Sequence, residues 1–244
     1  MRRRWLLVAF AFVALAASAG CLGGGTVSDQ QLAQNATYDW HANESVSVNA
    51  TGSEYHAVLN VTGANRSELR FSQSNAFTGE TPIQLSAIKF RYPNGTVVNA
   101  SAIPVSESRD ALTVTLPAQR GQFAYTAPTG SRSVTVPVVV SDVSYSVTLS
   151  AGMRVSVPLV SSVQPSGATA TLAEGRVHLA WQSVSADEVY VKYYLERDVY
   201  IFGGLLALAA LVALGGVVYF RRLIRGLERD RVESGLDVED DRGR

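Results

Sequence analysis

Residues 199–220 read VYIFGGLLALAALVALGGVVYF and contain no charged side chain. A helix rises about 1.5 Å per residue, so this run would extend about 33 Å and cross a hydrocarbon core of about 30 Å. Tyr200 and Tyr219 stand near its ends, where aromatic rings favour the headgroup layer, and arginines follow at once, at Arg221, Arg222 and Arg225. The pattern predicts a single transmembrane helix over 199–220, with the preceding chain outside the cell and residues 221–244 as a cytoplasmic tail, basic first and then acidic.

The start of the chain has the order of an export signal. Arginines follow Met1, an apolar run extends from Trp5 to Ala17, and small residues complete the pattern at Ser18, Ala19 and Gly20. We therefore expect residues 1–20 to be a signal peptide.

Cys21, the single cysteine, stands directly after these small residues and before Leu22-Gly23-Gly24-Gly25. The arrangement resembles a lipobox, although lipoproteins usually carry Leu, Val or Ile where this chain has Ser18. The resemblance implies lipidation of Cys21 and a Gly-rich tether over 21–35; the alternative is an ordinary signal peptide beside a chance cysteine. With one cysteine no intramolecular disulfide can form, so apolar burial must stabilise the exported part.

Charge is spread evenly over the exported part. Residues 22–198 hold 11 Lys and Arg against 14 Asp and Glu, without clusters. Nucleic-acid surfaces need clustered basic residues, so the sequence predicts no nucleic-acid partner.

The stretch 36–118 is rich in Asn, Ser and Thr, which favours a β-rich domain with polar edges. Seven N-x-[ST] sequons occur in and just before it, at Asn35, Asn43, Asn49, Asn60, Asn65, Asn94 and Asn99. Such sites are modified on exposed segments of exported proteins, so these asparagines are candidate N-glycosylation sites. The alternative is that strands of this composition form sequons by chance.

Alternating apolar residues predict strands within this stretch. Residues 55–61, 88–92 and 111–116 all show the alternation. Pro93-Asn94-Gly95-Thr96 follows the second of them, and Asn-Gly readily adopts the positive φ angles of a two-residue hairpin turn. We expect residues 97–98 to resume the paired strand.

Short strand patterns recur at about 8–12 residues in 121–198, which is typical of an antiparallel β-sandwich. Hairpin turns are expected at Ala151-Gly152 and Glu174-Gly175. The fold class is thus mainly β, with one or two antiparallel β-sandwich ectodomains before the helix. A boundary near 117–121 would separate two domains, whereas one larger sandwich would absorb the same strands.

Candidate catalytic residues are few. The histidines, His41, His56 and His178, are far apart and show no metal-ligand spacing. Asp39-Trp40-His41 is the most suggestive triplet, but its two ionisable side chains would converge only if the fold brought them together. Neither a nucleophile elbow nor a phosphate-binding glycine loop occurs. We therefore expect no enzyme activity, no cofactor and no metal site.

The span and the tail allow further contacts. Gly203, Ala207 and Ala210 form a small-residue face that would support a weak homodimer. Beyond the span, apolar residues recur on one side of a potential helix, at Leu223, Ile224, Leu227 and Val232. A helix lying on the inner leaflet would explain them, and the alternative is a solvated helical extension ending at Gly235.

The Arg-rich signal, the segment AGCLGGG, the sequon-rich β region, the span and the ending RRLIRGLERDRVESGLDVEDD together resemble a family of uncharacterised membrane proteins from haloarchaea. The preference for Arg over Lys, 19 to 2, fits a GC-rich genome of that kind. The resemblance covers most of the chain and implies its membrane topology, but it carries over no functional residue.

These features favour a non-enzymatic module at the outer face of the cell membrane that binds an unknown protein or envelope partner through its sheets or loops. Two alternatives stay open. One is an envelope hydrolase with carboxylates assembled from separate strands, and the other is a transmembrane signal element in which Arg197-Asp198 passes strain to the tail.

Overall fold

The computed structural model of the chain describes residues 27–41, 43–62, 67–75 and 79–233. The expected signal peptide, Cys21 and the acidic end of the tail lie outside the described residues. Contacts divide the chain into two units, one that ends at Tyr193 and one that begins at Tyr194. The first, the β unit, carries nearly all the strands.

The elements of the two units are, in chain order, α2 (Asp29–Leu32), β1 (Val46–Ala50), β2 (Glu54–Thr62), β3 (Glu68–Asn75), β4 (Gly79–Pro82), β5 (Ser86–Arg91), β6 (Val97–Asn99), η2 (Ala100–Ala102), β7 (Val105–Glu107), β8 (Leu112–Thr115), β9 (Arg120–Pro128), β10 (Ser133–Pro137), β11 (Val143–Thr148), β12 (Met153–Arg154), β13 (Ser162–Gln164), β14 (Thr169–Ala173), β15 (Arg176–Val184), β16 (Glu188–Lys192), β17 (Tyr194–Leu195) and α3 (Glu196–Glu233). The fold is mainly β, followed by one long apolar helix, as the sequence predicts.

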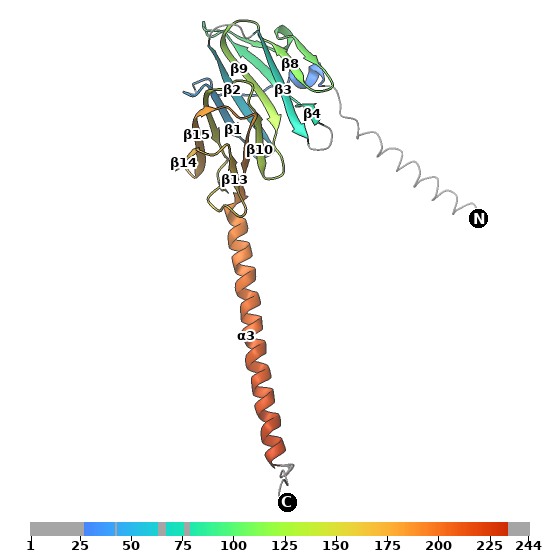
Figure 1. Cartoon of the computed structure of the whole chain (residues 1–244), viewed down its shortest axis with the longest axis vertical. Coiled ribbons are helices and arrows are strands. Elements are labelled where there is room, and N and C mark those ends of the chain that lie inside the picture. The colour runs from blue at the N-terminus through green and yellow to red at the C-terminus, as the bar shows by residue number, and fades with distance from the viewer. Residues whose placement is uncertain (1–26, 42, 63–66, 76–78, 234–244) are drawn as a thin grey trace, which may run out of the picture. The chain divides into compact units, whose positions relative to one another are not determined.

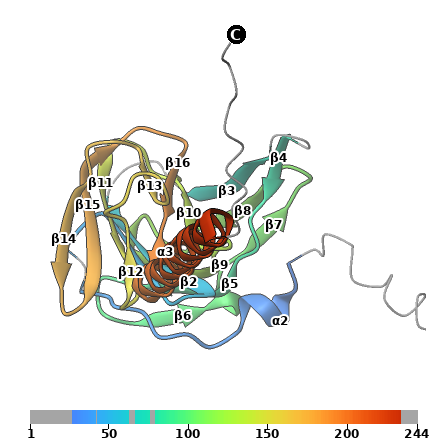
Figure 2. The same ribbon diagram turned by 90° about the horizontal axis from the view of Figure 1, so that it is seen from below.

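An eight-stranded sheet forms one layer of the β unit, in the order β14-β15-β11-β1-β2-β9-β5-β6 (Figures 1 and 2). Its neighbouring strands are antiparallel except β1 and β11, which pair in parallel from Val46↔Tyr145 to Asn49↔Thr148. The sheet that the sequence predicts as antiparallel therefore contains one parallel pair. A parallel pair needs a long crossover, and residues 51–142 supply it.

A second layer consists of a four-stranded sheet, β4-β3-β8-β7, and a three-stranded sheet, β10-β16-β13. Phe71 of β3 is fully buried and joins the layers, because its ring lies 6.0 Å from the ring of Phe123 and 5.0 Å from that of Tyr125 on β9. Trp181 of β15 donates its indole N–H to the Pro165 carbonyl beyond β13 at 2.9 Å. The core therefore consists of aromatic and branched side chains between two layers.

The large sheet combines strands from residues 36–118 with strands from residues 121–198, the two stretches that a domain boundary near 117–121 would separate. β2 pairs with β9 over its whole length, from Glu54↔Pro128 to Thr62↔Arg120, and β1 pairs with β11. Of the two arrangements that the sequence allows, the structure has the single larger one. Residues 117–121 are a connection within one unit, because the strands on both sides of them share one sheet.

Two of the three expected hairpins are present. β5 and β6 pair across Asn94-Gly95, with a loop longer than two residues because the pairing begins at Arg91↔Val97. β14 and β15 pair across Glu174-Gly175, both at positive φ, as a two-residue turn requires. The hairpin at Ala151-Gly152 is wrong, because β11 is bonded to β1 and β15 on its two edges and has no free edge for β12.

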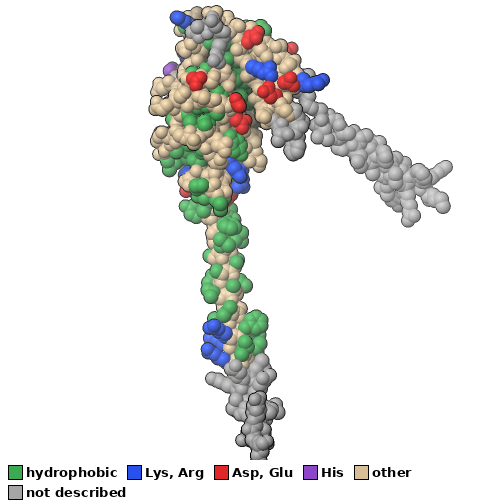
Figure 3. All heavy atoms as spheres, viewed as in Figure 1, with side chains coloured by type: hydrophobic (Ala, Val, Ile, Leu, Met, Phe, Trp, Pro, Cys, Tyr) green, Lys and Arg blue, Asp and Glu red, His purple; other side chains and the backbone are tan. Residues whose placement is uncertain are grey.

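Helix α3 includes the whole run 199–220 and continues to Glu233, past the expected end of the span. The part Glu196–Arg225 is long and apolar enough to cross a membrane, and its apolar side chains are exposed. Figure 3 shows hydrophobic side chains along it and Lys and Arg side chains toward its described C-terminal end. A helix that is apolar all round and unburied by protein is typical of a membrane span.

The buried tyrosines of the β unit include Tyr38, Tyr55 and Tyr125. Tyr38 donates its hydroxyl to the Ala87 carbonyl at 2.7 Å and shares a hydrogen bond of 2.8 Å with Thr126, whereas the hydroxyls of Tyr55 and Tyr125 have no hydrogen-bond partner among the described residues. Burial raises the pKa of Tyr38 to about 12, and it also raises the pKa values of Tyr55 and Tyr125 above the ordinary value. The folded state therefore favours the neutral phenols.

We expect the free energy of unfolding to decline steeply above pH 10. Below the ordinary tyrosine pKa of 10.0 both states hold neutral phenols, whereas above it the unfolded chain ionises first and gains stability. Each buried tyrosine contributes a slope of about 1.4 kcal/mol per pH unit until its folded pKa is reached. Chemical unfolding of the full chain in detergent at pH 8, 10 and 11 measures this, and Tyr38→Phe should remove one tyrosine's share. Equal stability at pH 10 and 11 would contradict the assignment.

Candidate functional site

The three histidines lie in separate places in the β unit. His56 Nε2 lies 3.2 Å from Glu54 Oε1, and its Nδ1 lies 3.2 Å from the Thr37 carbonyl oxygen. His178 Nδ1 lies 3.0 Å from Thr148 Oγ1 on the neighbouring strand. Both rings are thus engaged in contacts between neighbouring segments, and no group of three or more potential metal ligands occurs in the described part of the chain.

Asp39 and His41 do approach each other. His41 donates its backbone N–H to Asp39 Oδ1 at 3.0 Å, and its Nδ1 lies 3.7 Å from the same oxygen. The side chains are 78% and 89% exposed, respectively. Water screens such an exposed pair, so the attraction between the two side chains is weak.

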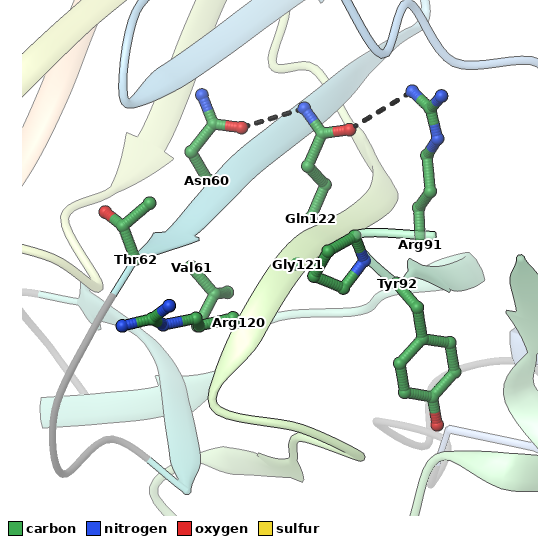
Figure 4. Close-up of a pocket in the computed structure, with 9 residues that line it drawn as sticks. Asn60, Val61, Thr62, Arg91, Tyr92, Arg120, Gly121 and Gln122 are labelled. Atoms are coloured by element: carbon green, nitrogen blue, oxygen red, sulfur yellow. Dashed lines mark hydrogen bonds between the residues drawn. The ribbon is translucent and has the colours of Figure 1, made fainter. Parts of the chain in front are cut away.

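The described residues form an open groove of about 690 Å³. Residues 60–62 at the end of β2, 91–93 at the end of β5 and 120–122 at the start of β9 line it. Figure 4 shows Asn60, Gln122 and Arg91 in a row, with Arg120 and Tyr92 extending from the adjoining strand ends. Two of the lining residues are arginines, and none is acidic.

Hydrogen bonds fix the amide side chains of the groove. Gln122 donates from Nε2 to Asn60 Oδ1 at 2.8 Å and to the Trp40 carbonyl at 3.0 Å, while its Oε1 accepts from Arg91 at 3.4 Å. Asn60 donates in turn to the Glu44 carbonyl at 2.8 Å. The two amides are therefore held in one orientation before any ligand arrives, which lowers the entropic cost of binding.

Arg91 is held by packing as well as by hydrogen bonding. Its guanidinium carbon lies 6.0 Å from the centroid of the Trp40 ring, within the range of a cation–π contact. Arg120 is exposed. Neither arginine has an ion-pair partner among the residues that the structure describes, so both positive charges are available to a ligand.

Gly121 lets the strands close beside the groove. Its φ is +150°, and a Cβ at this position would clash with the Arg91 carbonyl oxygen and lie 2.6 Å from Phe90 Cζ. Only glycine fits this backbone approach. The absence of a side chain at Gly121 thus allows Arg91 and Gln122 to meet across β5 and β9.

The groove and Lys192, the last residue of β16, lie at opposite ends of the β unit. Asp142, just before β11, donates its N–H to the Val184 carbonyl at 2.7 Å, so β11 begins where β15 ends. β1 runs parallel to β11 and β2 antiparallel to β1, so β2 finishes at this same end with Thr62. After the short turn 185–187, β16 runs away from the end that carries Thr62 and the groove, and it finishes at Lys192 at the other end.

The candidate glycosylation sites differ in their surroundings. The described asparagines Asn35, Asn43, Asn49, Asn94 and Asn99 are exposed. Asn60 is half-buried, and its Nδ2, the atom that would carry a glycan, is bonded to the Glu44 carbonyl. Asn65, like the candidate lipidation site Cys21, lies outside the described residues. Asn60 thus contributes to the groove, and a glycan there would break one of its hydrogen bonds.

Sequence reasoning did not single out Arg91, Arg120 or Gln122. Arg91 and Gln122 are 31 residues apart, and Gln122 and Asn60 are 62 apart, so no local spacing connects them. Only the register of β2, β5 and β9 brings them together.

Comparisons with known proteins give one match. Residues 42–239 match the model of a family of unknown function (DUF5803), a range that includes the strands lining the groove and all of α3. No curated protein and no solved structure matches the chain. Because the match covers most of the sequence, the chain belongs to the DUF5803 family of unknown function.

Proposed function

We propose that this protein is a non-catalytic binding module of the cell envelope, anchored by α3 and exposed to the outside, whose groove binds a carboxylate-bearing partner. The groove is the observation on which the proposal rests. It presents Arg91 and Arg120 without an acidic lining residue, beside two amides of fixed orientation. Guanidinium groups match carboxylates in shape as well as charge.

The position of the groove supports the same function. It opens at the end of the β unit opposite to Lys192, after which the chain continues into α3. The arginines that follow the apolar run favour a cytoplasmic tail, which puts the β unit outside. A groove at the far end would then face away from the bilayer, toward material of the envelope.

A non-enzymatic role is favoured over an envelope hydrolase by the distribution of carboxylates. The groove has none, and three further hollows, around Glu54, Asp29 and Glu107, have one each. Hydrolysis of glycosidic bonds generally uses two carboxylates on opposite sides of the bond. Lipidation at Cys21, glycosylation at the exposed sequons and a haloarchaeal origin accord with an envelope protein and belong to this proposal.

Binding to acidic polymers tests the proposal. We expect the full chain in mild detergent to bind polygalacturonate or polyglutamate, with affinity that falls as salt is added because exposed charges are screened. Arg91→Gln with Arg120→Gln should weaken binding at least tenfold, which corresponds to about 1.4 kcal/mol. The two polymers distinguish a glycan from a protein as the source of the carboxylates.

The control neutralises two arginines outside the groove: Arg70, which forms an ion pair with Glu80 at 2.9 Å, and the exposed Arg109. If Arg70→Gln with Arg109→Gln weakens binding as much, the effect is net charge and the groove is not the site. Arg120→Gln alone adds a variant at an exposed position, where the fold should be unaffected. Binding of neither polymer would contradict the proposed ligand class.

A further inference from the structure

An apolar tip projects from the loop between β12 and β13. Leu159 is 94% exposed, and its neighbours Val157 and Val160 are 40% and 44% exposed. Pro158 completes the run Val-Pro-Leu-Val. Single exposed apolar residues are ordinary, but a consecutive run of them is disfavoured in water unless it has a function.

The tip is an ordered turn. The Val157 carbonyl accepts hydrogen bonds from the N–H of Val160 at 3.1 Å, the N–H of Ser161 at 2.9 Å and the Ser161 hydroxyl at 2.7 Å. Ser161 itself is buried and anchors the turn to the β unit. Pro158 restricts the backbone further, because its ring fixes φ. The exposed leucine is thus presented by a preformed structure.

The tip lies at the same end of the β unit as Lys192, close to the point at which the chain leaves the unit and continues toward α3. β13 starts directly after it, and Ser162 pairs with Lys192, the last residue of β16. Only six residues lie between Lys192 and Val199, where the apolar run begins. The seven steps from Lys192 to Val199 span at most about 25 Å at 3.3–3.6 Å per residue. If α3 crosses a bilayer, this end of the β unit cannot be far from its surface.

We propose that the tip Val157–Val160 inserts into the headgroup layer of the membrane that α3 crosses, and so gives the β unit a second membrane contact. An apolar side chain at this depth is removed from water without a partner protein. Arg132 and Lys192 are exposed at the same end, since Ser133 pairs with Lys192. Their positive charges suit the lipid phosphates around an inserted leucine.

The contact has a consequence for orientation. A span alone leaves the β unit free to tilt about its short connection, whereas a second contact restricts the tilt. The groove at the opposite end would then be held away from the bilayer. The membrane contact does not depend on the groove having a ligand, so the two proposals fail separately.

Depth-dependent quenching tests the inference on the full chain. Leu159→Cys is introduced in a Cys21→Ser background, labelled with a small environment-sensitive fluorophore and reconstituted in phosphatidylcholine–phosphatidylglycerol nanodiscs. We expect headgroup-labelled and shallow spin-labelled lipids to quench this site at least threefold more than they quench a label at Val97→Cys. Val97 is a matched control, because it is also an exposed apolar residue but pairs with Arg91 beside the groove.

A third label, at Leu208→Cys within the apolar run, reports on the span. Quenching at position 208 by deep spin labels together with shallow quenching at 159 supports the proposal. If the label at position 208 is quenched but the label at position 159 is quenched no more than the control label at position 97, the tip contact alone is overturned. No quenching at 208 overturns the span and, with it, the tip contact. Aqueous iodide, a water-soluble quencher, provides a complementary check, because it should quench the label at position 97 and not the label at position 159.

Discussion

Deletion of residues 199–220 is expected to move the protein from the membrane fraction to the soluble fraction, with at least a tenfold fall in the membrane-bound share. The deleted run supplies nearly all the apolar surface of α3 that could contact lipid. Leu, Ile, Phe and Val each favour a bilayer centre by about 0.3–0.6 kcal/mol on insertion scales, and the run contains many of them. Fractionation of cells that express the two forms, followed by carbonate extraction, measures the shift.

Cys21→Ser is the matched comparison for this deletion. A single lipid chain gives marginal and reversible binding, whereas a spanning helix is effectively permanent. We therefore expect Cys21→Ser to leave the protein in the membrane and to alter only its processing and the protease sensitivity of residues 22–35. Mass spectrometry of the mature N-terminus shows directly whether Cys21 carries a lipid. Retention of the deletion variant together with release of Cys21→Ser would reverse the roles proposed for Cys21 and for residues 199–220.

Phe71→Ala is expected to destabilise the β unit by about 3–5 kcal/mol, because it removes a fully buried ring and leaves a cavity between the two layers. The ring contacts Phe123 and Tyr125 on the large sheet, so its loss affects the packing of the layers and not a single strand. Small domains have only about 5–15 kcal/mol of total stability, so a large fraction would be lost. Denaturant unfolding of the full chain in detergent, followed by tryptophan fluorescence, measures the change.

Leu172→Ala provides the control for size and hydrophobicity. Leu172 lies on the edge strand β14 and is 62% exposed, so its truncation should change the free energy of unfolding by no more than about 0.5 kcal/mol. Similar losses for the two variants would show that Phe71 does not lie in a closed core.

The direction of the strands gives the β unit two ends to which we assign different proposed roles. One end carries the groove with Arg91 and Arg120, and the other carries the tip at Leu159 and the exit at Lys192. A transmembrane signal element is the alternative that would use the end at Lys192, because the chain continues from there into α3. Removal of residues 223–244 without effect on the cell would argue against that role.

Several features were accessible from the sequence because they depend on local patterns. The apolar run 199–220 identifies a membrane-competent helix without any tertiary contact, since the length and polarity of the run suffice. The strands around 55–61 and 111–116 follow from alternation, and Glu174-Gly175 follows from turn chemistry. The fold class was therefore predictable, with strand ends displaced by a few residues.

The partners of those strands were decided only by the tertiary structure. β1 lies between β2, which is nearby in the chain, and β11, which is about 100 residues away and parallel to it. Ala151-Gly152 is a turn in sequence but closes no hairpin, because both edges of β11 are already bonded. Pairing between distant strands depends on which faces bury together in the whole core, and that information is not present in any local stretch.

The candidate sites divide in the same way. Hydropathy alone identified the candidate membrane helix, because transfer of a side chain from water to lipid depends on that side chain and little else. The groove required Asn60, Arg91 and Gln122 to meet from three strands, with Gly121 permitting their approach, and the apolar tip required Ser161 to fix the turn that exposes Leu159. Only the fold could determine these arrangements, because each of them brings together residues that are far apart in the sequence.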